Sequence, residues 1–313
     1  VRAEATVTFA APKVEHYLSA EADRVGRLVV APIGIPARLL DGEPEHWLNV
    51  TEPREVGALL QPRMREGHKG TYGHALIVGG AAGKSGAAAM AGLAALRAGA
   101  GLVTVACDDS SRMAPELMTA PLSDPPVAGK TVLAVGPGLG TEAGVAALLK
   151  RLLAKDCLRV LDADALNIAA REGLGLAGCI VTPHPGEMGR LTGKPAAEIQ
   201  SNRLEIARAF AMERRCTLVL KGHRTLIAFE DGTVWINPTG NPGMATGGTG
   251  DVLTGMIAGL LAQFPERTRE AVIAAVWLHG RAGDHAAEEL GEQSVIATDL
   301  LQFLPRAMAD ARV

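Results

Sequence analysis

The sequence predicts an α/β protein with a mostly parallel central sheet and helices on both of its faces. Between residues 75 and 306, short apolar runs alternate with amphipathic stretches of helical period. Several runs are apolar at consecutive positions, as in strands that are covered on both faces. Regular alternation of strand and helix favours parallel pairing. The expected strands are Ala75–Val78, Leu102–Ala106, Val132–Val135, Leu158–Asp162, Cys179–Val181, Thr217–Leu220, Thr225–Phe229 and Val234–Ile236.

The last two of these strands are predicted to pair antiparallel, as the exception in the sheet. They are joined across Asp231-Gly232, a sequence typical of tight hairpin turns. The helical segments between the strands are spaced as crossover connections require. The expected helices are Ser85–Ala98, Gly144–Leu153, Ala197–Glu213, Asp251–Gln263 and Arg269–Leu290.

Composition restricts the class of protein. The 313 residues are 48% hydrophobic, enough for one large domain or one domain with a small appendage. A net charge of -3 and a pI near 6.3 argue against a nucleic-acid partner. The sequence contains no run of about 18 apolar residues, so we expect no membrane span. It also shows no charged and then apolar leader, so we expect a cytoplasmic protein. The four cysteines form no CxxC pair and are interpreted as buried thiols.

The strongest local signal is the glycine-rich run from Asn237 to Asp251, which leads directly into an apolar helix. Glycines at a helix start leave backbone N–H groups accessible, and the positive end of the helix dipole adds to the attraction for an anion. Asp251 would lie in the first turn, beside a bound phosphate. Its simpler role is to complement the dipole, which contributes about 0.3–1 kcal/mol and should keep the carboxylate ionised. The preceding glycines and prolines favour a functional site.

Two further glycine-rich segments are weaker signals. Val78–Ser85 resembles a phosphate loop, but Val78 stands where that motif requires glycine. Gly136–Gly140 follows a strand, but Thr141 replaces the last glycine of a dinucleotide fingerprint. Each indicates either backbone close to a ligand or a tight strand-to-helix turn.

Polar residues follow three other predicted strands. Lys221, at a strand end, can reach a phosphate, although the segment Lys221–Thr225 also fits a charged hairpin turn. His184 lies between two prolines, which suits a fixed ligand contact better than a mobile base. A metal role is disfavoured because His184 and Glu187 are the only nearby ligand types and Pro185 lies between them. Of Asp162 and Asp164, one could hold an ion through water, or Asp164 could cap the next helix. His279 and His285 follow a helical pattern and are interpreted as core or surface residues.

Taken in order, these segments resemble the ADP/ATP-dependent NAD(P)H-hydrate dehydratases of the ribokinase-like superfamily. The resemblance covers residues 65 to 306 and includes His68–Gly73, Gly136–Gly140, the His184 and Lys221 segments, and Asn237–Asp251. It implies a ribokinase-like three-layer α/β/α sandwich. It also implies a repair reaction, in which ADP or ATP phosphorylates the hydroxyl of the S-form of hydrated NADH or NADPH. Loss of phosphate, a far better leaving group than hydroxide, then restores the reduced nicotinamide.

The resemblance also assigns residues to roles. Asp251 would be the catalytic base, and Ala88, Gly138, His184 and Asp251 would contact the hydrate. The nucleotide-binding residues would be Lys221, Gly222, His223, Arg224, Thr225, Gly247, Gly248, Thr249 and Gly250. Mg²⁺ would accompany the nucleotide, and K⁺ is a further implied ion, but the sequence identifies no metal ligand. The implied partners are small-molecule substrates, and the implied assembly is a homotetramer.

The N-terminal segment resembles part of a different domain. Thr6–Lys13 and Gly26–Ile35 are similar to the closing strands of an NAD(P)H-hydrate epimerase domain, whose other parts these 313 residues do not include. Such a short stretch has no room for a core of its own. We therefore divide the chain into residues 1–55, the epimerase remnant and linker, and residues 56–313, the dehydratase domain. The start at Val1 rather than Met fits a fragment or a processed product.

Two other functions share some of these features. A kinase of a small hydroxylated metabolite has the same kind of glycine-rich anion site and would accumulate a phosphorylated product. A non-catalytic nucleotide sensor would bind without turnover and has no need of Asp251. His184 between its prolines and the Lys69–Gly73 segment favour the dehydratase over the kinase.

Overall fold

The structure, a computed structural model, describes residues 1–19, 21–36, 39, 46–142 and 144–312. Its centre is a ten-stranded sheet in the order β3-β12-β11-β10-β9-β8-β7-β4-β5-β6. Strand β11 is antiparallel to both of its neighbours, and every other pair in this sheet is parallel. The strands of the sheet are β3 (Leu48–Val50), β4 (His74–Val78), β5 (Leu102–Cys107), β6 (Met118–Pro121), β7 (Val132–Val135), β8 (Leu158–Leu161), β9 (Cys179–Val181), β10 (Thr217–Leu220), β11 (Leu226–Ala228) and β12 (Val234–Ile236).

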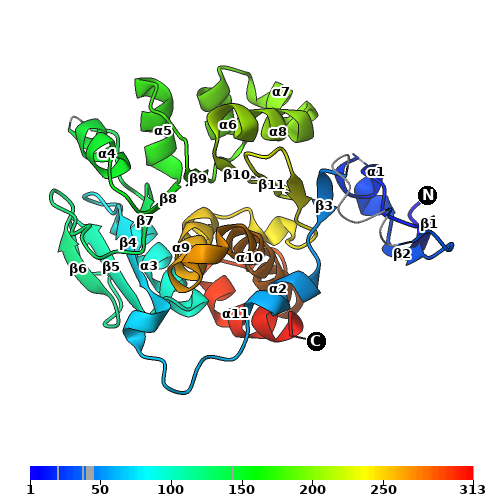
Figure 1. The fold of residues 1–313 in the computed structure, drawn as a ribbon, viewed down its shortest axis with the longest axis horizontal. Coiled ribbons are helices and arrows are strands. Elements are labelled where there is room, and N and C mark those ends of the chain that lie inside the picture. Colours follow the sequence, from blue (N-terminus) through cyan, green and yellow to red (C-terminus); the bar gives the residue numbers. More distant parts are fainter. Residues whose placement is uncertain (20, 37–38, 40–45, 143, 313) are drawn as a thin grey trace.

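Helices cover both faces of this sheet, which gives the expected three-layer α/β/α sandwich (Figure 1). One hydrophobic core lies against α2, α3, α9, α10 and α11, and the other lies against α4, α5, α6, α7 and α8. The helices of the structure are α1 (Glu15–Leu18), α2 (Pro53–Leu59), α3 (Ser85–Ala98), α4 (Val145–Leu153), α5 (Ala163–Glu172), α6 (Pro185–Thr192), α7 (Ala196–Ser201), α8 (Arg203–Arg214), α9 (Thr249–Gln263), α10 (Thr268–Leu290) and α11 (Ala297–Asp310). Among them, no helix combines the length and apolarity that crossing a membrane requires.

Strand β4 shows why the central strands are apolar at consecutive positions. Ala75 and Ile77 belong to the core on the α9 side, whereas Leu76 and Val78 belong to the core on the α5 side. Successive side chains of a strand point to opposite faces, so a strand between two helical layers needs apolar residues throughout. This burial confirms the expected sheet.

Helices α3 and α9 pack unusually closely because their contact is made by small residues. Helix α3 contributes alanines, and a Cβ added at Gly255 of α9 would lie 2.0 Å from the carbonyl oxygen of Ala91. At Gly259 the added Cβ would lie 2.4 Å from the carbonyl oxygen of Ala95. Glycine is required here for close approach, and this contact fixes the direction in which α9 meets the sheet edge.

The expected elements differ from the structure in several places. The helix expected at Ala197–Glu213 is two helices, α7 and α8, because the backbone leaves the helical region at Asn202. Helix α11 was missed, and it contains Pro305 in its interior. Helix α6 was also missed; Pro185 occupies its first turn, where the absent N–H costs nothing. The sequence reasoning gave no bounds for α5, which it anticipated only as the helix after Asp164, and it did not name the edge strand β6.

The N-terminal segment forms a separate two-stranded parallel sheet of β1 (Ala5–Phe9) and β2 (Arg27–Ala31). Val7 and Phe9 are 59% and 58% exposed, whereas Thr8 and Ala22 are buried. Strand β3, however, pairs with β12 in the main sheet, although the division at residue 55 placed it in the linker.

We predict that Gly255→Val lowers the free energy of unfolding by about 1–3 kcal/mol or more, because the new side chain collides with backbone of α3. Urea denaturation of the purified protein measures this. Gly175→Ala is the matched control, since a Cβ at Gly175 meets nothing within 4 Å. Equal stability of the two variants would show that α3 and α9 can separate at little cost.

Candidate functional site

The candidate site lies at the edge of the sheet where the parallel strands end. Gly138 follows β7, Asp162 follows β8, His184 follows β9 and Lys221 follows β10. Because these strands are parallel neighbours, their carboxyl ends bring the four residues to one edge. The topology therefore brings together residues that lie up to 83 positions apart in the sequence.

Helix α9 begins at this edge with an open, glycine-lined turn. Gly248 precedes the helix at φ 97°, and a Cβ there would lie 2.6 Å from the terminal methyl carbon of Met90. A Cβ at Gly247 would meet nothing within 4 Å, so this side of the turn is open. The first amides of a helix have no partner within it. Accessible amides at the positive end of α9 form a suitable anion site.

Lys221 supplies the positive charge beside this turn. Its Nζ lies 2.8 Å from Oδ1 of Asp162 and 3.8 Å from Oε2 of Glu187. A Cβ on Gly250 would lie 3.4 Å from the same Nζ. Burial alone would lower the pKa of Lys221, but the surrounding carboxylates outweigh it and raise the pKa. Lys221–Thr225 does form the turn between the antiparallel strands β10 and β11, in which Leu220 faces Leu226, so the hairpin-turn interpretation is confirmed. Within that turn, Lys221 is a largely buried cation that lies against α9.

Asp162 is the buried member of this charge cluster. Its Oδ1 accepts from Lys221, and its Oδ2 accepts from the hydroxyl of Thr254 on α9 at 2.7 Å. One carboxylate thus ties the end of β8 to both the end of β10 and the second turn of α9. Asp164 has another role, because its Oδ2 accepts from the backbone N–H of Gly140 at 2.8 Å.

Asp251, in the first turn of α9, has an altered acidity. Burial, and then the negative charge of Asp162, raise the pKa of Asp251 to about 7, although Lys221 opposes this. The expectation that the helix dipole keeps its pKa low is wrong. The dipole contributes less than burial together with three neighbouring carboxylates, Asp162, Asp164 and Glu187. A carboxylate with a pKa near neutrality is suited to accept a proton and release it again.

The two glycine-rich segments that resembled phosphate loops pack against each other. The N–H of Gly80 donates to the carbonyl of Pro137 at 2.9 Å, and the N–H of Ala81 donates to Gly138 at 2.8 Å. A Cβ on Gly79 would lie 2.0 Å from the carbonyl oxygen of Pro137. The glycines of the first segment therefore permit close approach of two loops. Ala88 lies behind them and is fully buried, so its side chain offers no surface to a ligand.

His184 occupies the N-cap of α6, which explains its fixed orientation. Its Nδ1 accepts from the N–H of Gly186 at 3.0 Å, and its backbone N–H donates to Glu187 at 2.8 Å. The His184 side chain is half exposed. Since Glu187 also approaches Lys221, His184 belongs to the same edge of the site.

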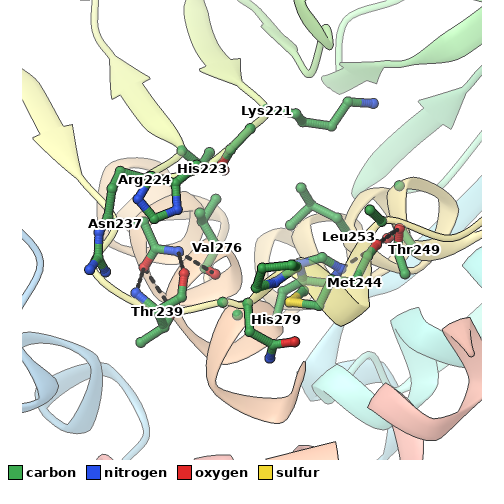
Figure 2. A pocket seen from close by; sticks show the side chains of 18 residues that line it. Lys221, His223, Arg224, Asn237, Thr239, Met244, Thr249, Leu253, Val276 and His279 are labelled. Atoms are coloured by element: carbon green, nitrogen blue, oxygen red, sulfur yellow. Dashed lines mark hydrogen bonds between the residues drawn. The ribbon is translucent and has the colours of Figure 1, made fainter. Parts of the chain in front are cut away.

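A cavity of about 380 Å³ opens beside the start of α9 (Figure 2). In that view, Arg224 and Asn237 lie at one end and Thr249 at the other. Seven of the nine expected nucleotide-binding residues line it, and the other two, Gly247 and Gly248, do not. The expected base Asp251 is not part of the lining either. The expected residues in the lining are Lys221, Gly222, His223, Arg224, Thr225, Thr249 and Gly250; the others are Asn237, Thr239, Gly240, Asn241, Pro242, Met244, Ala245, Leu253, Val276, His279 and Gly280.

Arg203, which the sequence reasoning did not select, holds the loop after β10. Its guanidinium donates to the carbonyl oxygens of Leu220, His223 and Arg224. Three carbonyls facing inward require unusual backbone, and Arg224 has a φ of 53°. The only sequence signal for this contact was an arginine inside an expected helix, which is too common to be selective.

Helix α10 contributes further residues that the sequence reasoning did not assign to the site. Asp284 accepts from the N–H of Gly240 and from the side-chain amide of Asn241. A Cβ on Gly280 would lie 2.3 Å from Oγ1 of Thr239, so the loop before α9 rests directly on this helix. His279 lines the cavity, and its interpretation as a core or surface residue was incomplete.

Within the described part of the chain, no group of three or more His, Cys, Asp and Glu side chains is arranged to hold a metal ion. Asp162 and Glu187 are already engaged with Lys221. Any ion at this site would therefore need ligands from a bound molecule or from water.

Comparison with known proteins supports the three-layer architecture and also identifies the family of the chain. A ribokinase-like superfamily protein from Enterococcus faecalis matches with a TM-score of 0.75 at 31% identity, covering 84% of this chain and 96% of that one. The fold is therefore ribokinase-like. The family described as NAD(P)H-hydrate dehydratase matches residues 75–306, and the chain belongs to this family.

Two curated relatives show how the family match extends. The ADP-dependent (S)-NAD(P)H-hydrate dehydratase of Bacillus subtilis is 38% identical, and the match covers 80% of this chain and 94% of that protein. The bifunctional NAD(P)H-hydrate repair enzyme of Moorella thermoacetica is 44% identical, and the match covers 97% of this chain. The chain spans about three fifths, 62%, of the length of that bifunctional relative.

A solved structure matches over nearly its whole length. The ADP/ATP-dependent NAD(P)H-hydrate dehydratase from Bacillus subtilis, co-crystallised with ATP and Mg²⁺, has a TM-score of 0.76 at 36% identity. The match covers 84% of this chain and 98% of that one.

We predict that Asp251→Asn stabilises the protein at high pH. A carboxylate whose pKa rises from 3.8 to about 7 on folding contributes stability below pH 4 that is lost as the pH rises through 7. Asn carries no such charge, so the variant should be more stable at pH 8 by a few kcal/mol and nearly equal to wild type at pH 4. Urea denaturation of both proteins at several pH values measures this. A stability difference that does not change with pH would show that Asp251 has an ordinary pKa.

Proposed function

We propose that the protein catalyses the ADP-dependent dehydration of the S-form of hydrated NADH and NADPH, releasing AMP and phosphate and so repairing these metabolites. The observation that carries the proposal is the placement of Asp251, with a pKa of about 7, in the glycine-lined first turn of α9 beside Lys221. This places a base, an anion site and a cation together at the edge of a cavity.

In this proposal the cavity holds the nucleotide and the start of α9 holds its reacting phosphates. Lys221, Gly222, His223, Arg224 and Thr225 bind along one wall of the cavity. The amides of Gly247, Gly248, Thr249 and Gly250 meet the charge that develops on the transferring phosphoryl group. Lys221 adds a cation that needs no rearrangement, because Asp162 and Glu187 already hold it in place.

The hydrate is proposed to bind on the other side of Asp251. Asp251 takes the proton of the hydrate's hydroxyl group. The hydroxyl oxygen attacks the terminal phosphorus of ADP, and AMP leaves. The ring nitrogen lone pair of the hydrate then expels phosphate, and loss of a proton from the adjacent ring carbon forms the C=C bond that restores the reduced nicotinamide. Gly138 and His184 contact the hydrate, and Ala88, being buried, supports the loop that receives it.

Mg²⁺ is proposed to arrive with the nucleotide. The described residues form no protein cage for an ion, which fits Mg²⁺ because it keeps several waters and is often held through substrate phosphates. Asp162 and Glu187, the buried carboxylates beside the anion site, would hold its hydration shell. The ion would neutralise charge on the phosphates. The B. subtilis relative was co-crystallised with ATP and Mg²⁺. We also propose that activity requires K⁺.

The division of the chain is part of the same proposal. Residues 1–55 are assigned to the epimerase remnant and linker, and residues 56–313 to the dehydratase domain. The sheet of β1 and β2 has exposed apolar side chains, which supports its assignment as part of a larger domain in which further strands or helices would cover them. Because β3 joins the main sheet, the dehydratase unit is better started at Leu48. Homotetrameric assembly and a cytoplasmic location are also proposed, and light scattering tests the former.

We predict that the chain regenerates NADH from the S-hydrate with ADP and Mg²⁺, and that kcat rises with pH through about 7 as Asp251 ionises. Asp251→Asn should reduce kcat by about 10²–10⁴-fold, because Asn accepts no proton. NADH absorbance measures turnover. Replacing ADP with ATP tests the choice of nucleotide, and replacing KCl with NaCl tests the K⁺ requirement. Accumulation of a phosphorylated hydrate without NADH would instead indicate a kinase, and a folded Asp251→Asn working within a few-fold of wild type would place the base elsewhere.

We predict that Lys221→Ala weakens ADP binding at least tenfold and hydrate binding much less. Its loss removes a charge beside the anion site and leaves Asp162 and Glu187 without their partner. Calorimetry with each ligand measures the two affinities, and the melting temperature shows how much folded protein remains. Lys150→Ala is the matched control, since Lys150 pairs with Glu172 on the surface. Unchanged ADP affinity in folded Lys221→Ala would contradict the assignment.

A further inference from the structure

His279 contacts the backbone of the turn that forms the anion site. It lies on α10 and lines the cavity, and its Nε2 is 2.9 Å from the carbonyl oxygen of Thr249, the first residue of α9 (Figure 2). A carbonyl oxygen only accepts hydrogen bonds, so Nε2 must carry the proton. This contact therefore selects one form of the ring, with its donor directed at Thr249.

The ring is uncharged at neutral pH. Burial lowers the pKa of His279 to about 4, and the charge of Lys221 also lowers it. His279 therefore supplies a hydrogen-bond donor without adding a second cation to the site. The attraction for an anion comes from Lys221 and the start of α9.

Thr249 joins the loop before α9 to the helix itself. Its hydroxyl lies 3.0 Å from the carbonyl oxygens of both Met244 and Thr246. Met244 in turn packs on bare backbone of α10, because a Cβ on Gly283 would lie 2.3 Å from its sulfur. Thr249 is thus fixed by its side chain to the preceding loop and by its carbonyl to His279.

We propose that His279 is a positioning residue that fixes the amides of Gly247–Gly250 for the nucleotide phosphates by donating to the carbonyl of Thr249. The inference rests on the proposed nucleotide-dependent function of this site. It follows from three contacts that meet at Thr249, the first residue of α9: two with carbonyl oxygens of the preceding loop and one with His279 of α10. Without the His279 donor, the start of α9 keeps its sequence but loses its only side-chain anchor to α10 among the described contacts of Thr249.

Three substitutions separate the donor from the volume of the ring. His279→Leu fills the space without a donor. His279→Gln restores an N–H donor at a similar distance from the backbone. The side chain of His279→Asn also carries an N–H donor but is too short to reach the carbonyl oxygen of Thr249. We expect His279→Leu and His279→Asn to weaken ADP binding about tenfold and to lower kcat for NADH recovery. We expect His279→Gln to regain ADP affinity to within about threefold of wild type. Calorimetry with ADP and Mg²⁺ and the absorbance assay measure these.

His74→Leu is the matched control. His74 is also a histidine whose pKa is lowered to about 4, and its Nε2 lies 2.8 Å from Oγ1 of Thr104. It begins β4, so it lies at the opposite edge of the sheet from the site. We expect His74→Leu to lower the melting temperature and leave ADP affinity within twofold of wild type.

The outcomes are distinct. Equal loss of ADP affinity in the Leu and Gln variants would overturn the proposal, since ring shape would then matter and the donor would not. Wild-type affinity in all three variants would also overturn it, as would an equal loss in His74→Leu. If His279→Leu fails to fold, the comparison of Gln with Asn still decides. If wild-type protein binds ADP but recovers no NADH, the proposed dehydration fails, whereas the ADP affinities still test the role of His279.

Discussion

The buried contact between Lys221 and Asp162 is the interaction on which the site depends. Asp162 holds the ammonium at 2.8 Å with one oxygen and the hydroxyl of Thr254 with the other. It therefore joins two strand ends to α9. A buried cation needs such a partner, because desolvation would otherwise remove its charge. The same cluster carries more negative than positive charge, and this excess, added to burial, raises the pKa of Asp251 to about 7.

Small residues give the charge cluster its geometry. Gly255 lets α9 lie against the backbone of α3, and Gly280 and Gly283 let the loop before α9 lie on α10. Gly248 adopts a backbone conformation that other residues rarely adopt, at the point where the chain enters the helix. The start of α9 is thereby held from two sides by backbone contacts. Such an arrangement presents amides to an anion without needing to rearrange on binding.

The sequence predicted much of the sheet but less of its surroundings. Strands β7, β9, β10 and β12 and helix α3 begin and end where expected, because their apolar patterns are long or sharply bounded. Helix α11, with its internal Pro305, and the division of the expected helix at Asn202 were not predictable from pattern alone. Tertiary packing stabilises these elements, and local propensity does not report it.

The sequence by itself determined the order of most strands of the sheet, the glycine-rich entry into α9, and the position of Asp251 in its first turn, since each depends on neighbours along the chain. The tertiary structure alone decided that Lys221 is paired with Asp162, that His279 donates to Thr249, and that Asp251 has a raised pKa. These properties arise from burial and from distances between side chains on separate elements. Neither is encoded in local sequence, because the sheet first has to bring its strand ends to one edge.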